Sequence, residues 1–447
     1  MIRSQTLRLT AVLTLALAAT AATTANAAVP ALSSRPGAAY TVYMDFGGFA
    51  FSGNWGNNAS YKPGTTAAYS GSTDQVQNVW ARVAEKYSAF NVNVTTVDPA
   101  VTAGQSGTDL LRQNYYDAHA KLMHTVIGGN GSWTGGGGVS YLGVTQNAQA
   151  GSNGYHTDWV FAEESPSDVQ FIGEAVTHEN GHGFTLNHEG DSGIVNAPNS
   201  EYSSNNGASG NGSYAPIMGD SYGVQRGTWR TGNYYNSGNG VTTTQNDVQS
   251  MLSNSGMTLA DDGIAHSFVS ATALPLTGTS VDATHATGTI KPASSSTPTP
   301  IRINNYTKDY FKFTLGSAST ITLNLADGGE WVTPSVTAAG ATLRSKLNIY
   351  QSGNLITPFA VATEAGDTLS ESYTGALAAG DYYAEITSFG GYASTFDPNA
   401  KYFDMGSYVL SGTSITGPAV VPEPTTLALV ALGIAGFAIR RRAKNAG

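Results

Sequence analysis

The chain has 447 residues, a length at which two or three folded units are expected. With 40% hydrophobic and 10% aromatic residues and a formal net charge of -10, its composition argues against wholesale disorder. It contains no cysteine, which excludes disulfide scaffolds, cysteine nucleophiles and thiolate zinc sites and leaves His, Asp and Glu as metal ligands. The acidic balance, with a basic cluster only at the far C-terminus, argues against a nucleic-acid partner.

Residues 1–27 have the pattern of a secretory signal peptide. Two arginines precede an uncharged apolar run, Leu9–Ala22, and Ala25-Asn26-Ala27 forms a small-x-small cleavage site. We therefore expect the chain to use the export machinery and to begin, once processed, with a short segment over residues 28–39. A membrane anchor is the alternative, which the short alanine-rich run and the cleavage site disfavour.

The segment 40–262 is expected to form an α+β domain, with a small mixed sheet and helices packed on it. Apolar residues at spacings of three and four predict a helix over Ser72–Tyr87 that begins with a capping box of Ser72 and Gln75. Strands on both sides of this helix predict a parallel crossover. The expected strands are Tyr40–Phe46, Asn91–Thr96, His124–Ile127, Val139–Val144 and Trp159–Ala162.

Three histidines lie within eleven residues, at His178, His182 and His188. Ser165-Pro166-Ser167-Asp168 offers the start of a helix with an apolar stripe at Phe171, Ile172, Ala175 and Val176. On that helix, His178 and His182 lie one turn apart on one face, where both imidazoles reach one ion. Three neutral imidazoles are suited to one catalytic zinc ion with an open fourth position.

This stretch resembles the metzincin zinc peptidases, whose motif is HExxHxxGxxH, often followed by glycine. The resemblance implies three ligands, His178, His182 and His188, with Glu179 as the base that activates the metal-bound water for peptide hydrolysis. The chain departs from the motif at its internal glycine, which is Thr185 here. Either Thr185 adopts the conformation of the sharp turn, or Gly183 takes over the bend.

Further features of the resemblance follow along the chain. Met218, within Pro216-Ile217-Met218-Gly219, matches the methionine turn that packs beneath the metal, and Tyr222 is a candidate oxyanion stabiliser. Val139, Ser140 and Tyr141 match the edge strand that pairs with an extended substrate. The acidic and amide residues between Asp191 and Asn206 suggest a Ca²⁺ site, although a solvated loop is the more favoured interpretation.

Residues 266–415 are expected to form an all-β sandwich, because short alternating segments are separated by turn residues. The segments are Asp309–Leu315, Ile321–Leu325, Leu347–Tyr350, Asp381–Ile386 and Ser407–Ser411. They resemble the bacterial pre-peptidase C-terminal domain. Two roles remain open for this domain, a passive spacer and a module that binds a substrate or a surface.

Residues 421–447 combine Pro422-Glu423-Pro424, a short apolar stretch over Leu427–Ile439 and three arginines. This arrangement resembles the PEP-CTERM sorting signal of Gram-negative bacteria. The resemblance implies recognition by an exosortase-type sorting enzyme, a transient or processed membrane anchor, and delivery to the cell surface or extracellular matrix. A permanent single-pass anchor is the alternative.

Together these patterns favour a secreted zinc-dependent endopeptidase that acts on a protein or peptide substrate. Two alternatives remain. One is a surface or matrix adhesion protein with a vestigial metal site, and the other is a zinc hydrolase that cleaves a non-peptide bond. The intact Glu179 argues against a vestigial site.

Overall fold

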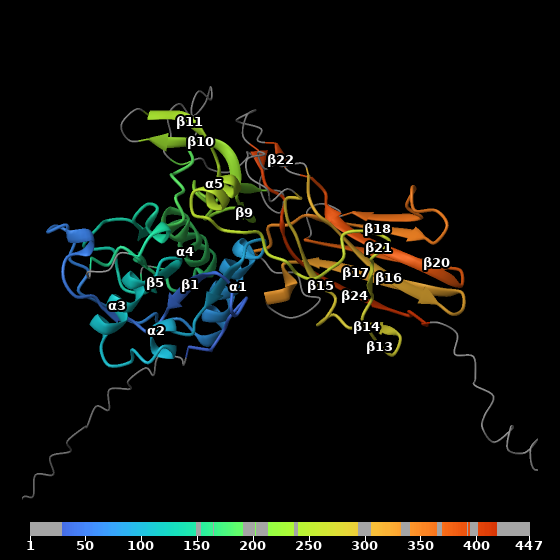
Figure 1. The fold of residues 1–447 in the computed structure, drawn as a ribbon, viewed down its shortest axis with the longest axis horizontal. Helices are drawn as coiled ribbons and strands as arrows, with labels where there is room; N and C mark the ends of the chain where they lie inside the picture. The colour runs from blue at the N-terminus through green and yellow to red at the C-terminus, as the bar shows by residue number, and fades with distance from the viewer. Residues whose placement is uncertain are drawn as a thin grey trace, which may run out of the picture.

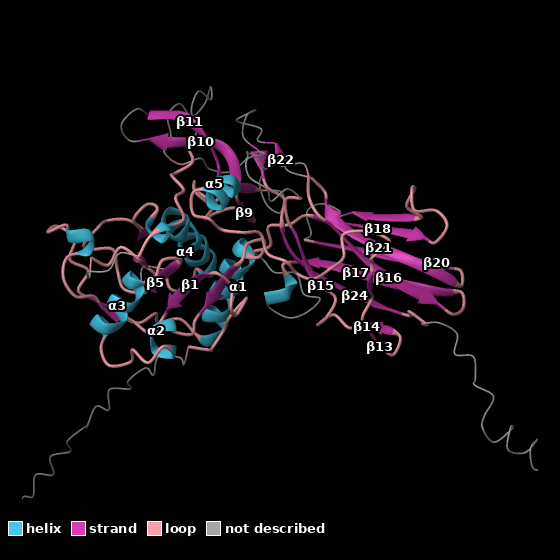
Figure 2. Cartoon of the chain, viewed as in Figure 1, coloured by secondary structure: helices cyan, strands magenta, loops and turns pink. Residues whose placement is uncertain are grey.

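The structure is a computed structural model that describes residues 29–148, 153–163, 165–190, 202, 213–236, 240–293, 305–331, 340–363, 369–390, 392–393 and 401–417. The expected signal peptide, the sorting tail and nearly all of the suggested Ca²⁺ loop lie outside these residues. Helices gather at one end of the molecule and long strands at the other (Figure 1, Figure 2). No helix among the described residues is long and apolar enough to cross a membrane.

A five-stranded sheet organises the first half of the chain, in the order β4-β1-β5-β7-β6. Four strands are parallel, and the short strand β6 pairs antiparallel with β7 at the edge. The bounds are β1 (Tyr40–Asp45), β4 (Val92–Thr95), β5 (Leu122–Ile127), β6 (Gly138–Val139) and β7 (Thr157–Val160). Most of the expected strands are thereby confirmed, but Val139–Val144 is wrong as a strand, because the chain leaves the sheet after Val139 and turns at Gly143, where φ is +70°.

Helices cover both faces of this sheet, which is usual for a parallel sheet with apolar strands. Helix α1 is confirmed over Thr73–Tyr87 with the capping box of Ser72 and Gln75, and it packs beside α4 (Val169–Gly183). Val42 and Met44 of β1 join the core beneath these helices, whereas Tyr43 joins an aromatic cluster on the opposite face. The other helices are α2 (Pro99–Thr102), α3 (Asp109–Ala118), α5 (Asp247–Ser253), η1 (Trp55–Asn57), η2 (Val144–Gln146) and η4 (Gly329–Trp331).

The second half of the chain forms two sheets around one apolar core, as expected of a sandwich. One sheet has the order β12-β16-β21-β18-β19, and the other has the order β15-β24-β17-β20. Their strands are β12 (Thr272–Ala273), β15 (Thr287–Ile290), β16 (Lys308–Leu315), β17 (Ser319–Asp327), β18 (Ser345–Gln351), β19 (Ala360–Thr363), β20 (Ser370–Leu377), β21 (Gly380–Ser388) and β24 (Gly406–Thr413). All five expected strand segments of this region fall within them.

The two halves share strands and core residues. A four-stranded sheet, β11-β10-β23-β22, joins β10 (Arg230–Asn236) and β11 (Gly240–Asn246) to β22 (Tyr392–Ala393) and β23 (Lys401–Tyr402). Trp331 packs in the core under α1 and donates from its indole N–H to Glu85 Oε2 at 3.1 Å. The small remaining strands are β2 (Phe49–Ala50), β3 (Thr65–Thr66), β8 (Tyr214–Pro216), β9 (Arg226–Thr228), β13 (Leu276–Thr277) and β14 (Ser280–Val281).

Candidate metal centre

Helix α4 carries the first two histidines. Its N-cap is Asp168, whose side chain accepts from the N–H of Phe171 at 2.9 Å, as the sequence predicts. Ile172, Ala175 and Val176 are buried against the sheet, so the helix is fixed along its length. Phe171, expected in the same stripe, is only half-buried and lines the cleft described below.

The end of α4 shows how the chain returns toward the histidines. The N–H of Leu186 donates to the carbonyl of Gly181 at 2.9 Å, and the N–H of Thr185 donates to that of His182 at 2.8 Å. These two bonds form a Schellman motif, which needs one residue in the left-handed region. That residue is Thr185, with φ of +79°, whereas Gly183 still belongs to the helix. The structure thus selects the first of the two expected turns.

We expect Thr185→Gly to raise the free energy of unfolding by about 1 kcal/mol, because glycine adopts this conformation without a Cβ penalty. Urea unfolding of the metal-free protein measures the effect. Thr185→Ala is the control, because it keeps the Cβ but removes the hydroxyl, which has no hydrogen-bond partner among the described residues. Equal gains in the two variants would mean that the hydroxyl, and not the backbone conformation, is the cause.

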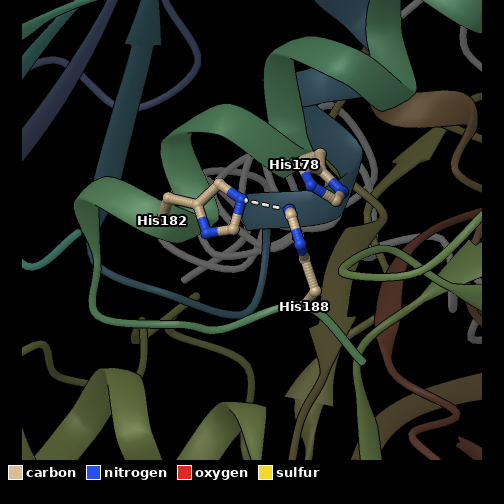
Figure 3. A group of neighbouring side chains, drawn as sticks. All are labelled: His178, His182 and His188. Carbon is tan, nitrogen blue, oxygen red and sulfur yellow. Dashed lines mark hydrogen bonds between the residues drawn. The ribbon is translucent and has the colours of Figure 1, made fainter. Parts of the chain in front are cut away.

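The structure brings His178, His182 and His188 together. One nitrogen of each imidazole lies within 4.8 Å of those of the other two. Figure 3 shows the three rings turned toward a common point, with His182 Nε2 and His188 Nε2 only 2.9 Å apart. This distance is that of a hydrogen bond between one protonated and one unprotonated nitrogen. Two imidazole ligands of a tetrahedral zinc ion lie roughly 3.3 Å apart, so a small opening of this pair would bring both lone pairs onto one ion.

Backbone carbonyls orient the two helical histidines. His178 Nδ1 donates to the carbonyl of Ile217 at 2.8 Å, and His182 Nδ1 donates to that of Leu186 at 2.7 Å. These bonds place the proton on Nδ1 and leave the Nε2 lone pair for a ligand. Burial, followed by the neighbouring His188, lowers the pKa of His178 to about 3, and burial lowers that of His182 as well. The donor set therefore fits zinc, which binds neutral imidazole.

Met218 lies directly beneath the ligand helix. Its side chain is fully buried, and its sulfur contacts α4 at Gly181, between the two helical histidines, where a Cβ would overlap it. The N–H of Gly219 donates to the carbonyl of Pro216 at 2.9 Å, so the segment is a tight turn. The same turn presents the Ile217 carbonyl to His178. Met218 therefore lies where the sequence predicts a packing methionine.

A cleft of 470 Å³ opens in front of the histidines. Glu179 lines it and is 6% exposed, and its side chain lies against β6, where Gly138 leaves room for it. Burial, and then the nearby carboxyl of Asp158, raise the pKa of Glu179 well above its usual range. Tyr222 also lines the cleft, and burial followed by the charge of Glu179 raises the pKa of its phenol.

The expected edge strand is only partly in the cleft. Val139 and Ser140 line it, but Tyr141 does not, because its ring packs against Trp55 with the ring centroids 4.2 Å apart. Two side chains of the cleft, those of Asp220 and Tyr202, were missed by the sequence analysis, as were the three glycines Gly136, Gly137 and Gly138 that line it. The ring of Tyr202 lies 4.5 Å from that of His188, and nothing in the local sequence pattern marks it.

Asp262, His266 and Asp309 form a second cluster of ligand-type residues among the part of the chain that the structure describes. This cluster lies where the chain enters the sandwich. Lys291 Nζ is 3.9 Å from Asp262, and His266 Nδ1 is 3.0 Å from Asp309 Oδ1, so side chains of this region already pair with both carboxylates. The three histidines are therefore the better candidate for a metal.

Comparisons with known proteins identify the sorting tail. Residues 420–442 match the PEP-CTERM protein-sorting motif, so the chain is an exported protein with a signal for surface association and for recognition by an exosortase-type enzyme. No curated protein matches the chain. Among solved structures, it is similar to the pre-peptidase C-terminal domain of collagenase from Bacillus anthracis, at 15% identity over 24% of this chain and 76% of that one, with a TM-score of 0.16.

Proposed function

We propose that this chain is a secreted zinc-dependent endopeptidase of the metzincin type, exported to the surface or extracellular matrix of a Gram-negative bacterium. The observation that carries the proposal is the convergence of three histidines on one point, with Glu179 beside them in an open cleft. His178, His182 and His188 would hold the ion. Zinc in such a site polarises a carbonyl and lowers the pKa of water toward ~7.

The residues of the chain have distinct parts in this proposal. Glu179 takes up the proton of the attacking water and passes it to the leaving amine. Strand β6 is the edge strand of its sheet, since it pairs with β7 along one side only among the described strands. It lines the cleft, so its second side can pair with an extended peptide. Tyr222 lines the same cleft and would donate to the oxyanion.

Casein hydrolysis by the purified protein tests the proposal. We expect ortho-phenanthroline to abolish hydrolysis, zinc to restore it, and the non-chelating meta isomer to have no effect. Protein that binds zinc but cleaves only a non-peptide ester or amide would indicate the other kind of hydrolase. Protein that binds no metal and adheres to a glycan or matrix protein would contradict the proposal in favour of a binding function.

A further inference from the structure

The loop that carries His188 is held by the β10–β11 hairpin on both sides. Gln245 of β11 accepts from the N–H of Asn187 at 3.0 Å and donates to its carbonyl at 3.1 Å. Glu189 pairs with Arg230 of β10, at 3.0 Å between Nε and Oε2, with both side chains fully buried. Because both neighbours of His188 are bonded to one hairpin, this hairpin sets the direction of the imidazole.

Arg230 is the central residue of this support. Its Nη2 donates to the carbonyl of Gly190 at 3.3 Å, and its backbone N–H donates to Asp247 Oδ2 at 2.9 Å. The guanidinium packs against the Cα of Gly232, where a Cβ would lie 2.5 Å from Nε. A small displacement of Arg230 would therefore move Glu189 and, through it, His188.

A strand from the C-terminal half completes the support. Strand β23 pairs antiparallel with β10, with Tyr402 opposite Arg230, and Figure 1 shows β22 of the same sheet beside the hairpin. Tyr402 is 1% exposed, and the Arg230 guanidinium carbon lies 5.8 Å from its ring centroid. The ring centroid also lies 4.7 Å from that of Tyr214 in β8, the strand that leads into the Met218 turn.

We propose that Tyr402 is a positioning residue of the metal centre, which makes the C-terminal half a part of that site and not a spacer. The ring contacts two supports of the site, Arg230 for His188 and β8 for the Ile217 carbonyl that orients His178. The inference rests on the proposed metal site, but not on the bond that the enzyme cleaves. Partners bonded directly to a metal ligand typically change metal affinity by about 10- to 100-fold, and Tyr402 would act by displacing such partners.

Cobalt binding by the full exported chain tests the inference, because Co²⁺ absorbs visible light in a manner that depends on its ligands. We expect Tyr402→Leu to weaken Co²⁺ binding by about 10- to 100-fold in competition with a chelator, and to change the visible spectrum. Tyr402→Phe keeps the ring and should retain the affinity and the spectrum of the unmodified chain. Unchanged binding in Tyr402→Leu would overturn the inference.

Trp331→Leu is the matched control, because Trp331 also joins the two halves but contacts Glu85 and Trp80 rather than the support of His188. It should lower the melting temperature without weakening Co²⁺ binding. If Trp331→Leu weakened Co²⁺ binding as much as Tyr402→Leu does, docking of the two halves alone would explain the effect, and the role of Tyr402 would be overturned. If Tyr402→Leu does not fold, Tyr402→Met replaces it, since methionine fills an irregular space flexibly but has no ring face for Arg230. Weaker binding is again expected, and unchanged binding overturns the inference.

Co²⁺ binding and casein hydrolysis by the unmodified chain distinguish failure of this inference from failure of the proposed function. An unmodified chain that binds Co²⁺ but hydrolyses no casein would contradict only the peptidase activity. An unmodified chain that binds no Co²⁺ would contradict the metal site, and with it both proposals.

Discussion

Replacing Glu179 by glutamine should lower kcat/KM for casein by about 10²- to 10⁴-fold, the usual contribution of a general base. Glutamine keeps the shape of the side chain against β6 but cannot take up a proton. The zinc content should stay at that of the unmodified chain, because Glu179 is not among the three residues whose nitrogens converge. Kinetics with a fluorogenic casein, together with metal analysis of the same samples, measure both quantities.

The control for this substitution is Asp74→Asn, which makes the same change of charge at an exposed position in the first turn of α1. It should leave kcat/KM unchanged. Full activity in Glu179→Gln would remove Glu179 from the mechanism. Loss of activity together with loss of zinc would mean that the carboxylate supports the metal site rather than the proton transfer.

The local parts of the site could be predicted from the sequence. The four-residue spacing places His178 and His182 on one face of a helix, and Asp168 marks where that helix begins. Both features depend on neighbours within a few residues. The turn at Thr185 could be stated only as one of two alternatives, because a β-branched residue with positive φ opposes local preference and is held by the surrounding packing.

The long-range parts of the site could not be predicted. His188 is held by Gln245 and Arg230, and the pairing of β10 with β23 joins segments that no periodicity relates. Tyr141 shows the opposite error, because the sequence suggested a strand over residues 139–144, whereas β6 ends at Val139 and Tyr141 lies outside the sheet. The sequence indicates residue types and local elements. The pairing of distant strand edges depends instead on how the two halves pack.

Gly138→Ala should lower kcat by about 10²-fold, which is the cost expected when a catalytic group is displaced by ~1 Å. A Cβ at Gly138 would lie 2.5 Å from Glu179 Oε1 and 2.8 Å from its Cγ, so either Glu179 or the edge of β6 must move. Steady-state kinetics should show the loss mainly in kcat if Glu179 moves, and mainly in KM if the strand edge moves. Zinc content should not change.

Gly223→Ala is the matched control, since a Cβ there meets no atom within 4 Å. It should leave the kinetics unchanged. The decisive comparison is the double variant, because Gly138→Ala should add almost nothing to the loss already caused by Glu179→Gln if it acts through that carboxylate. Fully multiplicative losses would show that Gly138 acts on the substrate strand independently of Glu179, and would contradict the placement of the base against β6.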